Sequence, residues 1–280
     1  MRIKRVRLYD NSSESSLRVR KILLEKFAEL GIKVCDKNYQ LAIAIGGDGT
    51  FLKMLSSNEF NSSIYYTGIN LGRLGVLQDI EEDEVDLFLS SLFHDEFLIQ
   101  KSSLLEMNIV TSDKKIYQYY SFNEFVIREV GLRTTTLDLF VGHDQLERLV
   151  GDGVIISSTI GSSAYNASLG GGIILGNLEV MQLTPIALVR AGIHHQFFNS
   201  LVFSKDQKLI IYPKGRTNYP KGRTNSLIFS LDGQNVEVDK VEKIRIGISN
   251  RKIKMIVLPH SRVKRLSQKI LVPSIDTTFR

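Results

Sequence analysis

Only one of the 280 residues is a cysteine, Cys35. A single thiol excludes an internal disulfide and any metal site built from several cysteines. No apolar run approaches the roughly 20 residues that are needed to cross a bilayer. The first ten residues, MRIKRVRLYD, also lack the apolar core of a signal peptide. We therefore expect a cytoplasmic protein without a membrane partner.

Signatures of metal and nucleic-acid binding are also missing. His194 and His195 lack the spacing of structural zinc ligands. We therefore predict no metal held mainly by protein, and any cation is expected to be Mg²⁺ held largely by phosphates. The net charge of +6 permits anionic partners. The basic residues are spread out and do not alternate with aromatic residues, so we expect no nucleic-acid partner.

The densest pattern in the chain is LAIAIGGDGTFLK, at Leu41–Lys53. Apolar residues end abruptly at Gly46, Gly47, Asp48, Gly49 and Thr50, and a helical pattern follows. Glycines let the backbone turn sharply, and the start of a helix directs N–H groups and partial positive charge at the turn, which suits phosphate. Since a phosphate cradle alone has no need of a carboxylate, Asp48 suggests chemistry on a hydroxyl or a metal.

The first third of the chain alternates predicted strands and helices. We expect strands at Ile3–Tyr9, Leu41–Ile45 and Ile64–Ile69, and helices at Ser16–Leu30 and Asp83–Phe93. This alternation predicts a Rossmann-like, doubly wound parallel sheet with its ligands beyond the carboxyl ends of the strands.

From about residue 98 the pattern becomes β-rich and is broken by short polar turns, which predicts a second, sandwich-like domain. Met181–Val189 reads as a short connecting helix. We place the α/β domain at residues 1–97, completed by about 255–280, and the β-rich domain at 98–254. Within the latter, YPKGRTN at Tyr212–Asn218 is repeated at once, which reads as a duplication that extends a surface hairpin or as a basic flap near phosphate.

Three places could carry chemistry. Asp48 could accept a proton from a substrate hydroxyl or bond to the N–H groups of its own loop. Asn123 and Glu124 follow an aromatic run, and both could face one ligand only at a bulge or a strand end. The segment Asp152–Asn166 joins a strand to a run of hydroxyls, a glycine and Tyr165, which suits a nucleoside or a capped helix equally.

Taken together, these motifs resemble the NAD kinase family. The resemblance rests on GGDG at 46–49, Asn-Glu at 123–124, GDGVI and GSSAYNASLGG within 151–172, LTPIA at 183–187 and LDGQ at 231–234. It covers most of the chain. The GGDGT loop by itself is shared with phosphofructokinases and diacylglycerol-kinase-like enzymes, although the latter carry an LGTANDFA-like segment where this chain has LGRLGVL at 71–77.

The resemblance implies transfer of the γ-phosphoryl group of ATP to the adenosine ribose 2′-hydroxyl of NAD, with a divalent cation such as Mg²⁺. It implies a homo-oligomer, often a tetramer. The residues that match the family's functional positions are Asp48 as base, Asn123 and Glu124 for adenine and ribose, Ser163, Ala164 and Tyr165 around the dinucleotide, and Asp152 and Ala187 near the nicotinamide. Together with the glycine-loop residues Gly46, Gly47, Gly49 and Thr50, these form the predicted site.

The chain departs from the family pattern at two places. The family's TPTGSTAY reads STIGSSAY here, so Thr159 replaces a proline and Ile160 replaces a hydroxyl. Val76 replaces the aromatic residue of GRLGF. We expect Ile160 to make no hydrogen bond to adenine. Two alternatives to an NAD kinase are another GGDGT kinase, acting on a lipid or a sugar, and a non-catalytic dinucleotide-binding sensor.

Overall fold

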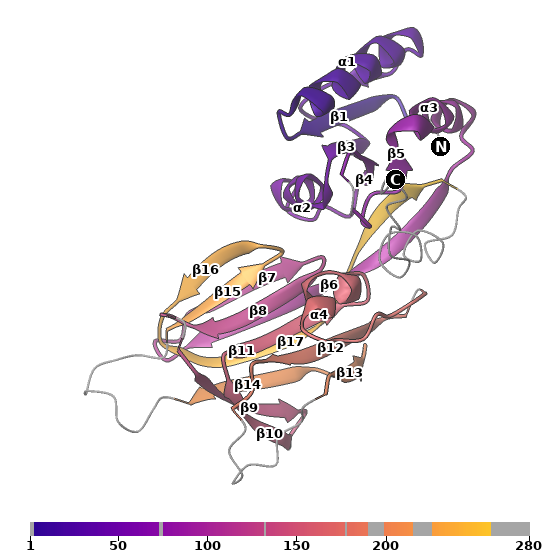
Figure 1. The fold of residues 1–280 in the computed structure, drawn as a ribbon. Coiled ribbons are helices and arrows are strands. Elements are labelled where there is room, and N and C mark those ends of the chain that lie inside the picture. The colour runs from indigo at the N-terminus through magenta and orange to yellow at the C-terminus, as the bar shows by residue number, and fades with distance from the viewer. Residues whose placement is uncertain are drawn as a thin grey trace, which may run out of the picture. The chain divides into compact units, whose positions relative to one another are not determined.

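A computed structural model of the chain describes residues 3–72, 75–131, 133–176, 178–189, 199–214 and 226–258. The described residues form two compact units (Figure 1). Unit 1 holds the described residues of 3–102 and 252–258, and unit 2 holds the described residues of 103–251. Arg73, the His194–His195 pair and most of the duplicated segment lie outside the described residues.

A parallel sheet forms the centre of unit 1. Its strands are β1 (Arg5–Asp10), β2 (Lys33–Val34), β3 (Leu41–Gly46), β4 (Tyr65–Asn70) and β5 (Ile80–Glu81). The order is β2-β1-β3-β4, and the far side of β4 pairs with β5 and with the last part of β17 (Val241–Val257), again in parallel. Every residue of β3 is buried, as expected for a strand with both faces covered.

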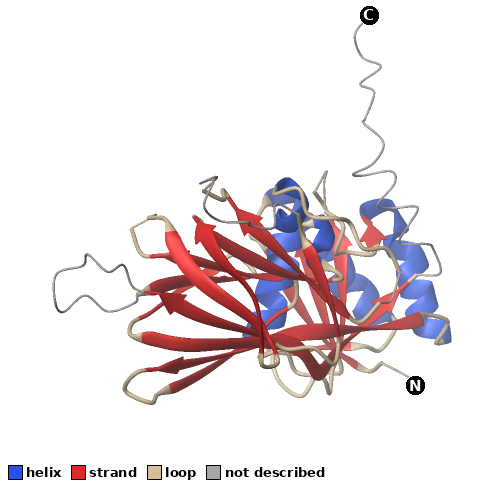
Figure 2. Cartoon of the chain, turned by 90° about the horizontal axis from the view of Figure 1, so that it is seen from below, coloured by secondary structure: helices blue, strands red, loops and turns tan. Residues whose placement is uncertain are grey.

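The longer helices of the described residues belong to unit 1, where they pack on this sheet (Figure 2). They are α1 (Glu14–Glu29), α2 (Asp48–Ser57) and α3 (Val85–His94), and a short 3-10 helix (Glu82–Glu84) precedes α3. The side chain of Ser13 caps α1 by accepting the Ser16 N–H, and Gly31 follows its end at a φ of +67°, a conformation that glycine adopts at little cost. The buried face of α1 carries Val19, Leu23 and Phe27, at the spacing the sequence predicts.

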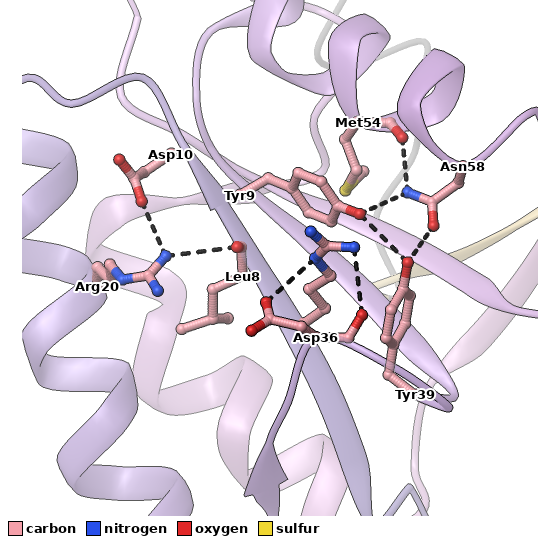
Figure 3. A network of polar contacts seen from close by, with 9 residues as sticks. Leu8, Tyr9, Asp10, Arg20, Asp36, Tyr39, Met54 and Asn58 are labelled. Atoms are coloured by element: carbon pink, nitrogen blue, oxygen red, sulfur yellow. Dashed lines mark hydrogen bonds and ion pairs between the residues drawn. The ribbon is translucent and has the colours of Figure 1, made fainter.

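The segment that precedes β3 is held by a polar network (Figure 3). The hydroxyls of Tyr9 and Tyr39 lie 3.2 Å apart, and Asn58 at the end of α2 bonds to both. The Arg7 guanidinium lies 4.8 Å from the centre of the Tyr9 ring and forms an ion pair with Asp36. Burial raises the pKa of Tyr9 to about 12, so its hydroxyl stays protonated across the physiological range.

The last described residues of the chain belong to the core of unit 1. Ile256 and Leu258 are each 1% exposed and pack in the same apolar cluster as Phe27. The Thr67 hydroxyl donates to the Ile256 carbonyl at 2.9 Å, and the Leu258 N–H donates to an Asp79 carboxylate oxygen at 2.6 Å. The parallel sheet is therefore completed from both ends of the sequence.

Unit 2 consists mainly of strands, with β6 entering from unit 1 and β17 leaving towards it. The strands are β6 (Leu98–Thr111), β7 (Ile116–Ser121), β8 (Glu124–Glu129), β9 (Thr135–Val141), β10 (Asp144–Gly151), β11 (Gly153–Ser158), β12 (Val180–Ile186), β13 (Leu201–Ser204), β14 (Leu209–Lys214), β15 (Leu227–Leu231), β16 (Gln234–Val238) and β17. Strands β7-β6-β17-β14-β9-β10 form one sheet, and β13-β12-β11-β8-β15-β16 form the other, which is wholly antiparallel.

One apolar cluster draws on both sheets of unit 2. Phe125, Ile156 and Phe229 come from the second sheet, and Leu139 and Ile244 from the first. Alternate residues along each strand enter this cluster, so unit 2 is a sandwich. The predicted fold class, an α/β domain with a β-rich sandwich-like domain, is confirmed.

The prediction of a helix at Met181–Val189 is wrong. Val180–Ile186 forms β12, which pairs with β11 on one side and β13 on the other. Its seven residues are too few for periodicity to separate a helix from a strand, and sheet pairing decides.

Candidate functional site

The glycine turn of unit 1 has the predicted strand–turn–helix geometry. Strand β3 ends at Gly46 and α2 begins at Asp48. Gly46 has a φ of +154°, and a β-carbon there would lie 2.6 Å from the Thr50 Oγ1, so only glycine fits. A β-carbon on Gly47 or on Gly49 would meet nothing within 4 Å. The backbone at the start of α2 is thus open to close approach, as phosphate binding by helix N–H groups requires.

The carboxylate of Asp48 is held by a neighbouring turn of unit 1. Its two oxygens accept the N–H groups of Val76 at 3.1 Å and Leu77 at 3.2 Å. Asp48 therefore has a structural role, although these N–H groups belong to a neighbouring turn, whereas the structural alternative predicted donors from its own loop. A carboxylate oxygen can accept more than one hydrogen bond, so this role leaves Asp48 able to accept a further proton.

The turn that holds Asp48 packs closely against the glycine loop. A β-carbon on Gly75 would lie 2.6 Å from the Asn70 Oδ1 and 3.0 Å from the Asp48 Oδ1. The Gln78 side chain donates to the Gly47 carbonyl at 2.6 Å. The two glycine turns therefore pack against each other at the carboxyl ends of β3 and β4. Ligands of such sheets bind at this edge.

In unit 2, Asn123 and Glu124 lie at the bend where β8 begins, so they occupy the strand end that the sequence required. Their side chains are 4% and 8% exposed. The Asn123 Oδ1 and the Glu124 Oε2 are buried, and no described residue hydrogen-bonds to them. Because buried polar atoms are normally satisfied, these two oxygens point to a ligand.

Asp232, which the sequence indicated only as part of LDGQ and not as a site residue, organises this bend. It lies in the turn between β15 and β16, and its carboxylate accepts the N–H groups of Phe122, Asn123 and Glu124 at 2.7, 2.7 and 3.2 Å. Removal from water, and then the nearby Asp232 carboxylate, raise the pKa of Glu124 to about 8. Glu124 is therefore predominantly protonated at neutral pH and can donate a hydrogen bond as well as accept one.

The hydroxyl-rich segment after β11 lies directly against the Asn123 bend. The Ser158 hydroxyl donates to the Phe122 carbonyl at 2.6 Å, and its N–H donates to the Asn123 carbonyl at 2.8 Å. A β-carbon on Gly161 would lie 2.1 Å from the Asn123 carbonyl oxygen. Two regions that are distant in sequence thus meet, as their predicted shared role requires.

The next residues form two short helical turns, Gly161–Ser163 and α4 (Tyr165–Ser168). Ser163 is 9% exposed, and its hydroxyl donates to the Ile160 carbonyl at 3.4 Å. Tyr165 is 39% exposed, and its hydroxyl accepts a hydrogen bond from Arg128 at 2.9 Å. Arg128 is a second residue of this region that sequence patterns did not indicate. Ala164 joins the two turns.

Asn166 anchors the segment to β12. It is fully buried, donates to the Gln182 Oε1 at 2.6 Å and accepts from the Thr184 hydroxyl at 2.7 Å. Thr159 supports the segment in another way, because its hydroxyl donates to the carbonyls of Leu178 and Val180. The replacement of a proline by Thr159 thus adds hydrogen bonds that a proline lacks.

Asp152 and Ala187 are neighbours at the other end of the β11–β12 pair. The Asp152 N–H donates to the Ile186 carbonyl at 2.9 Å, which places Asp152 beside Ala187. Both are exposed, and Ala187 has a φ of +44°, a conformation that is uncommon outside glycine. These two residues are therefore available to a ligand.

The described part of the chain contains neither a cluster of metal ligands nor a helix that could span a membrane. No three side chains among its His, Cys, Asp and Glu residues gather as metal ligands. None of the helices in that same part is both long and apolar enough to cross a membrane.

Two family descriptions match the chain. The ATP-NAD kinase N-terminal domain matches residues 7–97, and the ATP-NAD kinase C-terminal domain matches residues 123–258. An NAD kinase of Finegoldia magna is 32% identical over 256 residues, which cover 90% of this chain and 92% of that relative. The chain belongs to the NAD kinase family.

The fold agrees with that of solved NAD kinase family structures. The structure of yeast NADH kinase complexed with NADH has a TM-score of 0.83 at 18% identity, covering 100% of this chain and 89% of that one. The NAD kinase of Archaeoglobus fulgidus in complex with ATP has a TM-score of 0.74 at 21% identity, covering 95% and 98%. At such identities the likeness concerns the fold.

Proposed function

We propose that this chain is an ATP-dependent NAD kinase, which transfers the γ-phosphoryl group of ATP to the 2′-hydroxyl of the adenosine ribose of NAD and forms NADP. The observation that carries the proposal is the pair of buried oxygens, Asn123 Oδ1 and Glu124 Oε2, which no described residue satisfies. Membership of the NAD kinase family and the open glycine turn with its carboxylate support it.

Each candidate residue then has a role. The N–H groups of the Gly46–Thr50 turn bind phosphate, and Asp48 acts as the base. Asn123 and Glu124 bind the adenosine, and Ser163, Ala164 and Tyr165 contact the dinucleotide around it. Asp152 and Ala187 contact the nicotinamide end. Ile160 is 7% exposed and apolar, so its side chain contributes contact area and no hydrogen bond.

The reaction needs one proton transfer and one phosphoryl transfer. The 2′-hydroxyl loses its proton to the Asp48 carboxylate while its oxygen bonds to the γ-phosphorus of ATP. The bond from that phosphorus to the β,γ-bridging oxygen breaks, and ADP leaves. The N–H groups of Val76 and Leu77 hold the Asp48 carboxylate in one orientation, so little rearrangement is needed when the hydroxyl arrives.

We propose that a divalent cation such as Mg²⁺ arrives with ATP and is held mainly by its phosphate oxygens. Both oxygens of Asp48 already accept backbone N–H groups, which fits a base better than a metal ligand. When bound, the cation neutralises charge on the transferred phosphoryl group.

The test is to incubate the purified protein with ATP, Mg²⁺ and NAD and to measure NADP. ATP-dependent NADP formation supports the proposal. Phosphorylation of diacylglycerol or fructose 6-phosphate without NADP formation would instead select another GGDGT kinase. NAD binding without an ATP-dependent product would select a dinucleotide sensor.

We also propose, from the family resemblance, a cytoplasmic homotetramer. Light scattering coupled to size-exclusion chromatography measures the oligomer mass directly, and a monomer at working concentration would contradict this part of the proposal.

A further inference from the structure

We propose that Asp232 is a positioning residue for NAD: it fixes the bend that carries Asn123 and Glu124 and thereby sets the affinity for the adenosine group. The inference rests on the proposed function and extends it to a residue outside the predicted site. Asp232 is assigned no contact with substrate, and it acts through the two residues that it holds.

The hydrogen bonds around Asp232 converge on one short segment. Its carboxylate accepts the backbone N–H groups of Phe122, Asn123 and Glu124 and the hydroxyl of Ser121. Its own N–H donates to the Glu124 carbonyl at 3.3 Å. Burial raises the pKa of the Asp232 carboxyl, and the four donors oppose that shift by stabilising its charged form. Hydrogen bonds to an ionised acceptor are stronger than neutral ones.

A turn alone does not explain this arrangement. Asp232 and Gly233 have φ values of +48° and +84° and connect Leu231 to Gln234, a paired position of the β15–β16 hairpin. Two residues with positive φ form a type I′ turn, in which asparagine serves at least as well as aspartate. The turn therefore accounts for the backbone of Asp232, and only the bend at 121–124 uses its carboxylate.

The two unsatisfied oxygens belong to the segment that Asp232 holds. The backbone N–H groups of the bend point to Asp232. The Asn123 Oδ1 and the Glu124 Oε2 of the same bend accept no hydrogen bond from any described residue. Both side chains are more than nine-tenths buried, so small movements of the backbone displace them from a bound nucleoside. Proper placement of such groups, rather than their mere presence, determines binding.

The test is Asp232→Asn, because asparagine preserves the turn and the size of the side chain while removing the charge. We expect the Kd for NAD, measured by calorimetry, and the KM for NAD to rise about tenfold, equivalent to the loss of one charge-assisted hydrogen bond. The KM for ATP and kcat should change less than about threefold. Unchanged affinity for NAD in a folded variant, or an equal rise in the KM for ATP, would overturn the inference.

A matched control is Asp138→Asn in the same unit. Asp138 is also a carboxylate with several donors, since Arg148 bonds to it at 2.6 and 3.0 Å and Lys214 lies at 3.2 Å. This variant removes the same charge from a place outside the site, so the affinity for NAD should stay within about twofold. An equal loss of affinity for NAD in both variants would show that Asp232 has only a structural role, which would overturn the inference.

Two further measurements keep the result decisive. If Asp232→Asn does not fold, Ser121→Ala removes one of the four donors and should raise the Kd for NAD about threefold, and no change would overturn the inference. Wild-type protein that binds NAD without forming NADP would refute the proposed reaction, whereas the effect of Asp232→Asn on Kd would still test the positioning role.

Discussion

Gly161 and Asn123 are in closer contact than any side chain at position 161 would allow, because a β-carbon there would lie 2.1 Å from the Asn123 carbonyl oxygen. The φ of Gly161 is not in the left-handed region. The need for glycine therefore comes from the approach of two backbones. This contact joins the hydroxyl-rich segment to the proposed adenosine site.

Gly161→Ala should separate these two backbones. We expect the KM for NAD to rise at least about tenfold and the protein to lose roughly 1–3 kcal/mol of stability, which is typical of overpacking. Steady-state kinetics and denaturant unfolding measure the two effects. Gly172→Ala is the matched control, because its nearest neighbour would lie 3.5 Å from the new β-carbon, and it should change neither quantity appreciably.

Asp48→Asn should abolish turnover and leave the affinity for NAD within a few-fold. Removal of a general base lowers rates by about 10²–10⁴-fold, while an amide oxygen can still accept one of the two N–H bonds. Single-turnover assays and calorimetry measure the two properties. Asp36→Asn, at a side chain that is 90% exposed, is the control. Near-normal turnover of Asp48→Asn would refute the assignment of Asp48 as base.

Glu124 should make stability fall as the pH rises. Its pKa is about 8 in the folded protein against 4.5 in the reference state, so the folded state binds the additional proton between those values. The free energy of unfolding should then decline by at most about 1.4 kcal/mol per pH unit across this window and level off above it. Denaturant titrations of wild type and Glu124→Gln from pH 5 to 9 measure the effect.

The informative quantity is the stability difference between those two proteins, since other titrating groups largely cancel. Glutamine cannot ionise, so Glu124→Gln should gain stability relative to wild type as the pH rises. A difference that is constant with pH would show that Glu124 is already ionised in the folded protein.

Asn166→Ala should destabilise unit 2 by about 3 kcal/mol, because it leaves the buried Gln182 Oε1 without its donor and removes one of the two hydrogen bonds of the Thr184 hydroxyl. Thermal and denaturant unfolding measure the loss. Asn108→Ala removes a half-buried amide that bonds to Glu106 and should cost less than about 1 kcal/mol. Equal losses would mean that the Asn166 bonds contribute nothing specific.

Local patterns predicted unit 1 well, because its helices and strands are set by nearby residues. Ser13 caps α1, successive turns of α1 bury Val19 and Leu23, and β3 is apolar throughout before it meets the glycine turn. These signals lie within one element and so can be read from the sequence.

The sequence failed where distant segments decide the outcome. Met181–Ile186 is a strand because β11 and β13 flank it, and neither partner is indicated within the segment itself. Asp232 reads locally as half of an Asp-Gly turn, although its carboxylate serves the bend at 121–124. The resemblance included LDGQ, yet only the folded chain shows that the Asp232 carboxylate of this turn bonds to residues 122–124. Arg128 carried no sequence signal, and its contact with Tyr165 required coordinates.

The parallel sheet of unit 1, completed by the end of β17, has a consequence for biosynthesis. Residues 3–102 leave the ribosome first, but Ile256 and Leu258, which fill the same core, leave only after all of unit 2. During translation the early segment must therefore wait with an unfilled edge beside β4 while the sandwich is synthesised. The unit that begins the chain is the last to be finished.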